Sequence, residues 1–346
     1  MTPPRSRQKP ATIHDVARLA ELSKSTVSNV IRGAPGVNPE TKERVEKAIQ
    51  ALGYRPNVVA RQLVQQRTTV LGIVIGDLGN PFYAEMAKLI EGFAAARGFQ
   101  LMFCNTQVDE HTELKGIRSL IEHRVAGLLF LAYAGDADGA RLAVGDQLPV
   151  VFVTCDADWG DVVAVDDLAA ATAATRHLIE LGHQRIIYFA DTVREARAES
   201  ARRDGYLAAI NEAGLAPRVL RWHERPRLVR NDDGIRSMEA ILAGPDRPTA
   251  IFAANDLHAM DILDCADQYG LRVPEDLSII GFDDIAISRI ARISLSTIAQ
   301  PKEQLARIAV ELLIGRIRGD IQGRAMRHSL DFSLLKRRTT ARAPHP

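Results

Sequence analysis

The sequence contains little of what marks a secreted, membrane-spanning or metal-binding protein. Only 3 of its 346 residues are cysteines (Cys104, Cys155 and Cys265), and they lie far apart without a CxxC pair, so neither a disulfide framework nor a zinc site is expected. No apolar run approaches the roughly 18 residues of a membrane span. The basic N-terminal segment also lacks the apolar stretch of a secretory signal. We therefore expect a cytosolic protein that binds no membrane, metal or cofactor.

Motifs of common enzyme active sites are also missing. None of the patterns GxGxxG, GxxxxGK(S/T), GxSxG or HExxH occurs, and the 9 histidines are scattered. Adjacent acids occur at 166–167, 232–233 and 283–284. Such pairs can be general acids or metal ligands, but loop residues, helix caps or acceptors for ligand hydroxyls are the favoured interpretation. The sequence predicts a protein that is not an enzyme.

Net charge is uninformative at +1 until the chain is divided. Residues 1–67 hold 12 Lys and Arg against 5 Asp and Glu, a net charge of +7, whereas the remaining residues carry −6. A basic segment on an acidic body indicates a nucleic-acid-binding module joined to a second part. The alternative is a solvated basic tail, and a capacity to fold separates the two.

The basic segment has the signals of three short helices. Thr12 is the expected N-cap of the first helix, Ser23 that of a second helix over Lys24–Ile31, and Asn38 with Pro39 begins a third that stops at Gly53. Each helix is too short to be stable alone, so their apolar stripes must meet in one core. Two helices joined by a tight turn form a helix-turn-helix.

The second helix has the chemistry of a DNA-reading helix. Lys24, Ser25 and Asn29 lie opposite its apolar stripe and are expected to face base edges, because these side chains can hydrogen-bond guanine and adenine in the major groove. Thr26 and Ser28 are better placed for phosphates. The alternative is an ordinary exposed polar face.

Three stretches carry a family resemblance. ATIHDVARLAELSKSTVSNVIRG, VNPETKERV and ALGYRPNVVARQL resemble the headpiece of the lactose/galactose repressor (LacI/GalR) family. The resemblance implies an all-α helix-turn-helix headpiece over residues 11–56 and a hinge helix with linker over 57–68, whose Leu63 wedges into the minor groove and kinks the DNA. The DNA-binding residues expected from the helices and the resemblance are Thr12, Ser23, Lys24, Ser25, Thr26, Ser28, Asn29, Asn57, Arg61 and Leu63.

One departure concerns the turn of the helix-turn-helix motif. Glu21 stands where such motifs usually have glycine. If the turn needs a left-handed residue, Glu21 costs roughly 1 kcal/mol there.

From Thr69 onward, nine short apolar runs alternate with amphipathic stretches, such as one at 234–242. This alternation predicts an α/β fold of doubly wound parallel sheets with ligands at the carboxyl ends of the strands. It also resembles the two-lobed, periplasmic-binding-protein-like effector domain of the family. We expect this domain over 69–341, with lobe 1 over about 69–167 and 300–326 and lobe 2 over about 168–299 and 327–341.

Polar and aromatic residues at strand ends are the candidate effector contacts. By the resemblance, an aromatic at Phe82 or Tyr83 stacks on the effector, with one of the two expected in the core, and Arg202 binds ring hydroxyls or a carboxylate. The complete set is Asp77, Asn80, Phe82, Tyr83, Asp166, Arg202, Trp222, Asn255, Asp283 and Gln300.

Two departures leave the identity of the effector open. Thr154 stands where many members have an aspartate, which removes one hydroxyl acceptor. The arginine-rich stretch 220–230 either favours an anionic ligand or is a solvated loop, and the loop is the favoured interpretation.

The sequence as a whole predicts a transcriptional regulator. We expect a homodimeric repressor that binds a near-palindromic double-stranded DNA operator and responds to a sugar, uronate, sugar phosphate or purine in the interlobe cleft. A corepressor-type regulator that responds to a purine or another metabolite is the main alternative, and a solute-binding protein is a more distant one.

Overall fold

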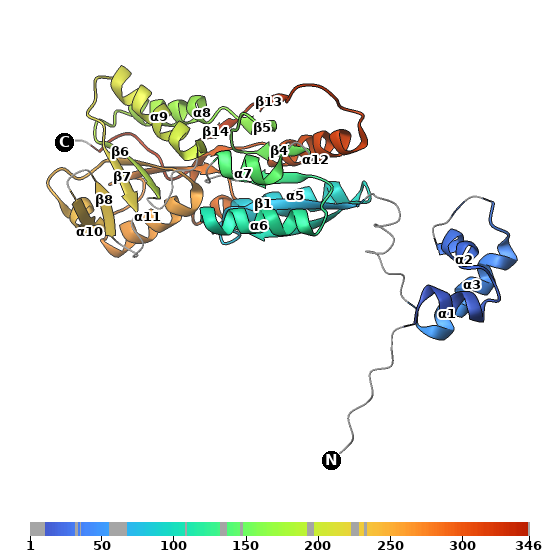
Figure 1. Cartoon of the computed structure of the whole chain (residues 1–346). Helices are drawn as coiled ribbons and strands as arrows, with labels where there is room; N and C mark the ends of the chain where they lie inside the picture. Colours follow the sequence, from blue (N-terminus) through green and yellow to red (C-terminus); the bar gives the residue numbers. More distant parts are fainter. Residues whose placement is uncertain are drawn as a thin grey trace, which may run out of the picture. The chain divides into compact units, whose positions relative to one another are not determined.

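The computed structural model describes residues 11–31, 34, 36–54, 68–107, 109–131, 137–145, 148–191, 197–222, 228–231 and 234–344. The chain separates into two compact units, and the division lies between Thr68 and Thr69 (Figure 1). Within the described residues, no helix is both long and apolar enough to cross a bilayer.

The first unit is a cluster of three helices, as the sequence predicts: α1 (Ile13–Leu19), α2 (Lys24–Ile31) and α3 (Pro39–Leu52). The Thr12 hydroxyl and the Asp15 carboxylate form a reciprocal capping box at the start of α1. Asn38 caps α3, and Gly53 ends it with a φ of 59°. Val16, Val27 and Val45 bring the three helices together in one buried core.

The turn between α1 and α2 is strained at the residue where the motif usually has glycine. Glu21 has a φ of 52°, in the left-handed region that side chains with a Cβ disfavour by about 1–2 kcal/mol. The turn therefore does need a left-handed residue, and the cost of roughly 1 kcal/mol expected for Glu21 applies.

The first lobe of the second unit is a six-stranded sheet with helices on both faces. Its strands are β1 (Val70–Ile75), β2 (Gln100–Asn105), β3 (Leu128–Leu131), β4 (Val150–Val153), β5 (Asp161–Val165) and β13 (Arg327–Leu330), and its helices are α5 (Pro81–Ala95), α6 (Glu110–Glu122), α7 (Ala137–Val144) and α12 (Lys302–Arg318). The sheet order is β13-β5-β4-β3-β1-β2, with every pair parallel. Helices α5 and α12 pack together on one face, and α6 and α7 pack on the other.

The second lobe is built on an eight-stranded sheet in the order β14-β12-β11-β10-β6-β7-β8-β9. Its strands are β6 (Ile186–Asp191), β7 (Val219–Trp222), β8 (Leu228–Asn231), β9 (Gly234–Ser237), β10 (Ala250–Ala253), β11 (Ser278–Asp283), β12 (Ser296–Ala299) and β14 (Ser333–Leu335). Its helices are α8 (Asp167–Glu180), α9 (Arg197–Glu212), α10 (Met238–Ala243), α11 (Asp256–Gln268) and the 3-10 turn η1 (Ala286–Arg289). Helices α8 and α9 cover one face, and α10 and α11 cover the other.

The sheets differ from the sequence-based prediction at their edges. The central strands of the second lobe are parallel, but β14, β8 and β9 pair antiparallel. The predicted helix at 234–242 is wrong in its first half, because β9 pairs with β8 and Ser237 caps α10 only afterwards. The stretch 220–230 is likewise not a plain loop, since β7 and β8 contain its two ends.

The lobe boundary near residue 326 also needs a correction. Strand β13 pairs with β5 in the first sheet, whereas β14 pairs with β12 in the second. The chain therefore crosses between lobes after Leu330, and residues 327–330 belong to lobe 1. The alternating exposure of this short edge strand gave no apolar run by which to recognise it.

Candidate nucleic-acid interface and ligand cleft

Helix α2 presents polar side chains on its outer face. Lys24, Ser25 and Asn29 are exposed, and Val27 on the opposite face is fully buried. The Ser23 hydroxyl fixes the start of the helix by accepting a 3.0 Å hydrogen bond from the Thr26 amide. This places the three side chains on the outward face that the sequence predicts, which suits base contacts from the early turns of a helix.

Several of the expected DNA contacts have local partners, including Ser25, whose hydroxyl oxygen lies 2.7 Å from that of Ser23, and others lie outside the described residues. The Thr12 hydroxyl lies 2.7 Å from Asp15 Oδ2, and the hydroxyl oxygens of Ser23 and Thr26 lie 2.8 Å apart. Thr26 and Ser28 are half-buried. Asn57, Arg61 and Leu63 fall outside the described part of the chain, so the hinge and its wedge stay a prediction.

A buried polar cluster lies at the carboxyl ends of the second lobe's strands, around Arg202 on α9. The Arg202 guanidinium donates from Nε to Asp167 Oδ1 over 2.7 Å and from Nη1 to the Ala254 carbonyl over 2.8 Å. Its Nη2 lies 3.9 Å from Asp283 Oδ1, and its central carbon lies 3.7 Å from the centre of the Phe282 ring. Arg202 is only 6% exposed, so two carboxylates, a carbonyl and an aromatic face hold it in one orientation.

Asp283 and Gln300 complete this cluster. Gln300 Nε2 donates to Asp283 Oδ1 over 2.8 Å. Burial raises the pKa of the Asp283 carboxyl to about 6, although Arg202 opposes the shift. Gln300 is 5% exposed, and its carbonyl oxygen Oε1 has no hydrogen-bond partner among the described residues. A buried acceptor without a donor carries a desolvation penalty of about 1–3 kcal/mol unless a bound molecule supplies the donor.

Tyr83 brings the first lobe to the same cluster. Burial raises the pKa of its hydroxyl, with further contributions from the charges of Asp283 and Glu199. The hydroxyl therefore lies near the charged side chains of the second lobe. Phe82 instead packs into the core under α5, with its ring 5.5 Å from that of Tyr83. Of the two adjacent aromatics, Tyr83 is the one placed to meet a ligand.

The remaining candidates are held at helix starts or turns. Asn80, Asp166 and Asn255 cap α5, α8 and α11 through their side-chain oxygens. The exposed Asp77 accepts a 2.8 Å hydrogen bond from the Gly79 amide. None of these four described side chains hydrogen-bonds Arg202, and the Trp222 side chain lies outside what the structure describes. Thr154 is buried with a φ of 59°.

A cavity of about 280 Å³ opens between the lobes beside the polar cluster. Asp166 and Asp167 line it from the second lobe, and Arg327 and His328 of β13 line it from the first. The buried Nε2 of His328 has no hydrogen-bond partner among the described residues. The cavity is close to the lower end of the range for small-molecule sites, and Asp167 faces both the cavity and Arg202.

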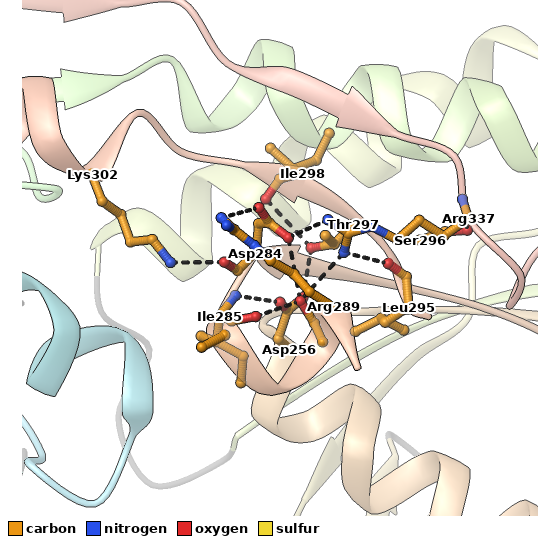
Figure 2. A network of polar contacts seen from close by, with 12 residues as sticks. Asp256, Asp284, Ile285, Arg289, Leu295, Ser296, Thr297, Ile298, Lys302 and Arg337 are labelled. Atoms are coloured by element: carbon orange, nitrogen blue, oxygen red, sulfur yellow. Dashed lines mark hydrogen bonds and ion pairs between the residues drawn. The ribbon is translucent and has the colours of Figure 1, made fainter. Parts of the chain in front are cut away.

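Sequence reasoning missed two groups of residues here. Asp167 was visible only as half of an acidic pair, and nothing in the sequence shows that it, rather than Asp166, fixes Arg202. The second group is the network behind Asp283 (Figure 2). There burial raises the pKa of Asp256 to about 7, and this carboxyl accepts hydrogen bonds from the Thr297 hydroxyl and the Ile285 amide.

Asp284 is the charged centre of that network. Burial acts to raise its pKa, but hydrogen bonds from Arg337 and Arg289, each 2.6 Å long, hold the pKa below its usual value. Asp283 and Asp284 have φ values of 114° and 52°, so the chain is strained directly after β11. The network fixes this turn, and with it the Asp283 carboxylate.

The same turn also connects the lobes. Glu85 of α5 accepts a 2.7 Å hydrogen bond from the Ala286 amide and pairs with Lys302. Lys302 also donates to the Asp284 carbonyl over 2.7 Å (Figure 2), and Ile285 is buried in the core of the first lobe. The residues that follow Asp283 therefore contact the helix that carries Tyr83.

Within the described residues, no cluster of His, Cys, Asp and Glu is arranged to hold a metal ion. The polar cluster is a set of hydrogen-bonding groups around the Arg202 guanidinium, and Arg327 adds a second guanidinium at the cavity beside it.

Family models match both units of the chain. The model for bacterial regulatory proteins of the lacI family matches residues 12–57. A model described as a periplasmic binding protein-like domain matches residues 175–340.

Curated relatives match along most of their own length. Catabolite control protein A of Priestia megaterium is 34% identical over 304 residues, which cover 87% of this chain and 91% of that protein. The HTH-type transcriptional repressor PurR of Aliivibrio salmonicida is 36% identical over 320 residues, 89% of this chain and 92% of that protein. The ribose operon repressor of Escherichia coli is 34% identical over 313 residues, 89% and 93% respectively.

Solved structures of transcriptional regulators are also similar to this chain over most of its length. The Lac repressor dimer bound to operator and the anti-inducer ONPF has a TM-score of 0.80 at 25% identity, covering 96% of this chain and all of that one. A complex of the transcriptional regulator CelR with cellobiose has a TM-score of 0.65 at 27% identity, with coverage of 95% and 99%.

Proposed function

Because this chain belongs to the lacI family of bacterial regulatory proteins, we propose that a neutral, hydroxyl-bearing effector binds between its lobes and controls its affinity for operator DNA. The chain is a DNA-binding transcriptional regulator and not an enzyme, which confirms the expectation from the sequence. The fold class, a helix-turn-helix unit followed by a two-lobed α/β domain, is likewise confirmed.

The observation that carries the effector proposal is the cluster of Arg202, Asp283 and Gln300. Its buried acceptors, the Asp283 carboxylate and Gln300 Oε1, are suited to hydroxyl donors. Asp167 and Asp283 together carry one more charge than Arg202 can balance, so an anionic effector meets repulsion at this cluster. Tyr83 offers an aromatic face to the apolar side of a sugar ring.

A purine is the second candidate, because ring N–H groups satisfy the same acceptors and a flat ring stacks on Tyr83. The relatives include both the repressor PurR and a ribose operon repressor, so their names do not decide between the two candidates. In either case we assign effector contacts to Tyr83, Arg202, Asp283 and Gln300, with Asn80, Asp166 and Asn255 at the margin.

For DNA, the proposal assigns base contacts to Lys24, Ser25 and Asn29 of α2. It assigns the minor-groove wedge to Leu63 in the linker over residues 57–68, in a homodimer that reads two half-sites. Leu63→Ala is expected to reduce DNA bending and specific affinity more than non-specific affinity. An unchanged bend angle would contradict the wedge.

The test is a ligand screen with a matched variant. The full chain is melted with ribose, cellobiose, glucuronate, hypoxanthine and guanine in turn, and each hit is titrated by calorimetry against the wild type and Asp283→Asn. We expect a neutral sugar or a purine to raise the melting temperature and to bind the variant at least about 10-fold more weakly. Tight binding of glucuronate alone, or equal affinity for the variant, would overturn the assignment.

A further inference from the structure

A groove lined by arginines lies between α10 and the sheet of the second lobe. Arg185 precedes β6, Arg218 precedes β7 and Arg236 lies on β9, and all three line one groove of about 630 Å³. Helix α10 lies close to β8 in this lobe (Figure 1). The groove has the size of a small-molecule site. Its apolar walls are formed by Pro217, Val219, Leu220, Ala240, Ile241 and Pro245.

Two of the guanidinium groups are held in place by the backbone. Arg185 Nε donates to the Arg247 carbonyl over 2.8 Å, and Arg218 Nη1 donates to the Asp246 carbonyl over 2.7 Å. Both carbonyls belong to the turn that follows α10. Among the described residues, the other nitrogens of these two groups, and all those of the exposed Arg236, have no hydrogen-bond partner. Several N–H donors therefore face the groove from fixed positions.

The groove is positive on a body that is otherwise acidic. Among the described residues that line it, Asp246 is the only carboxylate, so these residues carry a local charge of +2, whereas residues 68–346 together carry −6. A phosphate monoester carries close to two negative charges at neutral pH, and arginine binds phosphate in a bidentate geometry. A monocarboxylate would leave one of these positive charges unbalanced.

The groove is separate from the effector cluster. Arg185 and Arg218 lie at the amino ends of their strands, whereas Ala254 and Asp283 lie at the carboxyl ends of β10 and β11 in the same sheet. At about 3.3 Å per residue, strands of four to six residues separate the two ends by roughly 13–20 Å. A phosphate group bound by Arg185 and Arg218 therefore cannot also contact Arg202 or Asp283.

We propose that this groove is a second ligand site, which binds a small organic phosphate monoester. The phosphate contacts Arg185, Arg218 and Arg236, and the organic part lies against Pro217, Ile241 and Pro245. The effector cluster plays no part in it, so the site stands whether or not the effector assignment holds.

The probe is phenyl phosphate, which combines a dianionic head with a small apolar body, and benzoate is the monoanionic comparison. Each is titrated by calorimetry into the full chain in the presence of excess duplex DNA, which occupies the phosphate-binding face of the helix-turn-helix unit. We expect phenyl phosphate to bind at least about 5-fold more tightly than benzoate, since the extra charge is balanced only in this groove. The proposal would be overturned if phenyl phosphate does not bind at concentrations up to about 10 mM, because a Kd above that value corresponds to a binding free energy of less than about 3 kcal/mol.

Variants locate the site. Arg218→Gln combined with Arg236→Gln is expected to weaken phenyl phosphate binding at least about 10-fold. Arg307→Gln, which removes an exposed charge from α12 in the other lobe, should leave it unchanged. Equal weakening by both changes would mean non-specific attraction, and unchanged binding in the double variant would mean another site. If the double variant melts early, Arg236→Gln alone, at an exposed edge-strand position, is expected to weaken binding by about 3-fold.

Discussion

The two proposed binding regions of this protein hold their polar side chains in opposite ways. Lys24, Ser25 and Asn29 are exposed on a helix whose start is fixed by a cap between residues three apart. Arg202 is buried and fixed by partners 35 and 52 residues away in the chain. A change on α2 should therefore alter recognition and leave folding intact, whereas a change in the cluster should alter both.

The largest expected effect is that of removing the buried cation. Arg202→Met leaves Asp167 and Asp283 buried without their guanidinium, which should destabilise the second unit by about 3–5 kcal/mol. The control is Arg176→Met, because this arginine of α8 is exposed and pairs with the exposed Glu212, so its loss should change stability by less than about 0.5 kcal/mol. Urea unfolding of both variants checks the contrast, and similar midpoints would contradict it.

The contact between lobes should behave like the cluster. Glu85→Ala removes the carboxylate that accepts from the Ala286 amide and pairs with Lys302, and we expect a loss of about 1.5–3 kcal/mol. Glu85→Gln keeps an acceptor for Ala286 and should lose less. If the two variants unfold at the same urea concentration, the amide contact contributes nothing.

The exposed helix should show the reverse pattern. Asn29→Ala is expected to relax preference at one base pair of each half-site by about 1–3 kcal/mol, with a change in unfolding free energy within about 0.5 kcal/mol. Binding to a set of duplexes that differ at single positions measures this. Equal weakening on every duplex would assign Asn29 to the phosphates.

A buried histidine should make the stability of the second unit fall as the pH drops below about 6.5. His183 lies 3.0 Å from both the Thr249 hydroxyl and the Ala341 carbonyl, and burial lowers its pKa. Below pH 6.5 the unfolded chain therefore binds a proton before the folded chain does, and the stability that the neutral ring supplies is lost as the pH falls. The loss is at most about 1.4 kcal/mol per pH unit.

The unfolding free energies of the wild type and His183→Gln, measured at pH 5 and 7.5, isolate the contribution of the neutral His183 ring. The gap in stability between the two should narrow at pH 5. A gap of constant size would show that the folded and unfolded chains protonate this ring at the same pH, which would contradict the lowered pKa of His183.

The smallest expected effect is a gain in the stability of the first unit. Glu21→Gly should stabilise the first unit by about 0.5–1 kcal/mol, because glycine relieves the left-handed strain but also loosens the unfolded chain. Glu21→Ala keeps the strain and removes the exposed contact with Arg44, so it should not stabilise. Thermal melting of the two variants separates strain from charge.

The contrast between contacts made over a few residues and contacts made over many residues also explains what could be predicted from the sequence. The helices of the first unit follow from Thr12, Asn38 and Gly53, whose signals act over three or four residues. The parallel core of both sheets follows from apolar runs. Strand β13 could not be found in this way, because a half-exposed edge strand has no such run.

The cluster was only partly predictable for a related reason. Arg202, Asp283 and Gln300 were expected by resemblance, but the part played by Asp167 depends on which residue of an acidic pair faces inward at the start of α8. The choice between Phe82 and Tyr83 likewise depends on how α5 lies on its sheet, which adjacent residues in a sequence do not reveal. The roles of Asn57, Arg61 and Leu63 stay predictions.

The most direct test of the whole account is selection of binding sites from a random double-stranded DNA pool at physiological salt, with and without pooled sugars and purines. The account predicts an enriched near-palindrome whose affinity depends steeply on salt and changes when one class of metabolite is present, and Asp283→Asn should abolish that change. An enriched site whose affinity no metabolite alters, or no enrichment under either condition, would contradict it.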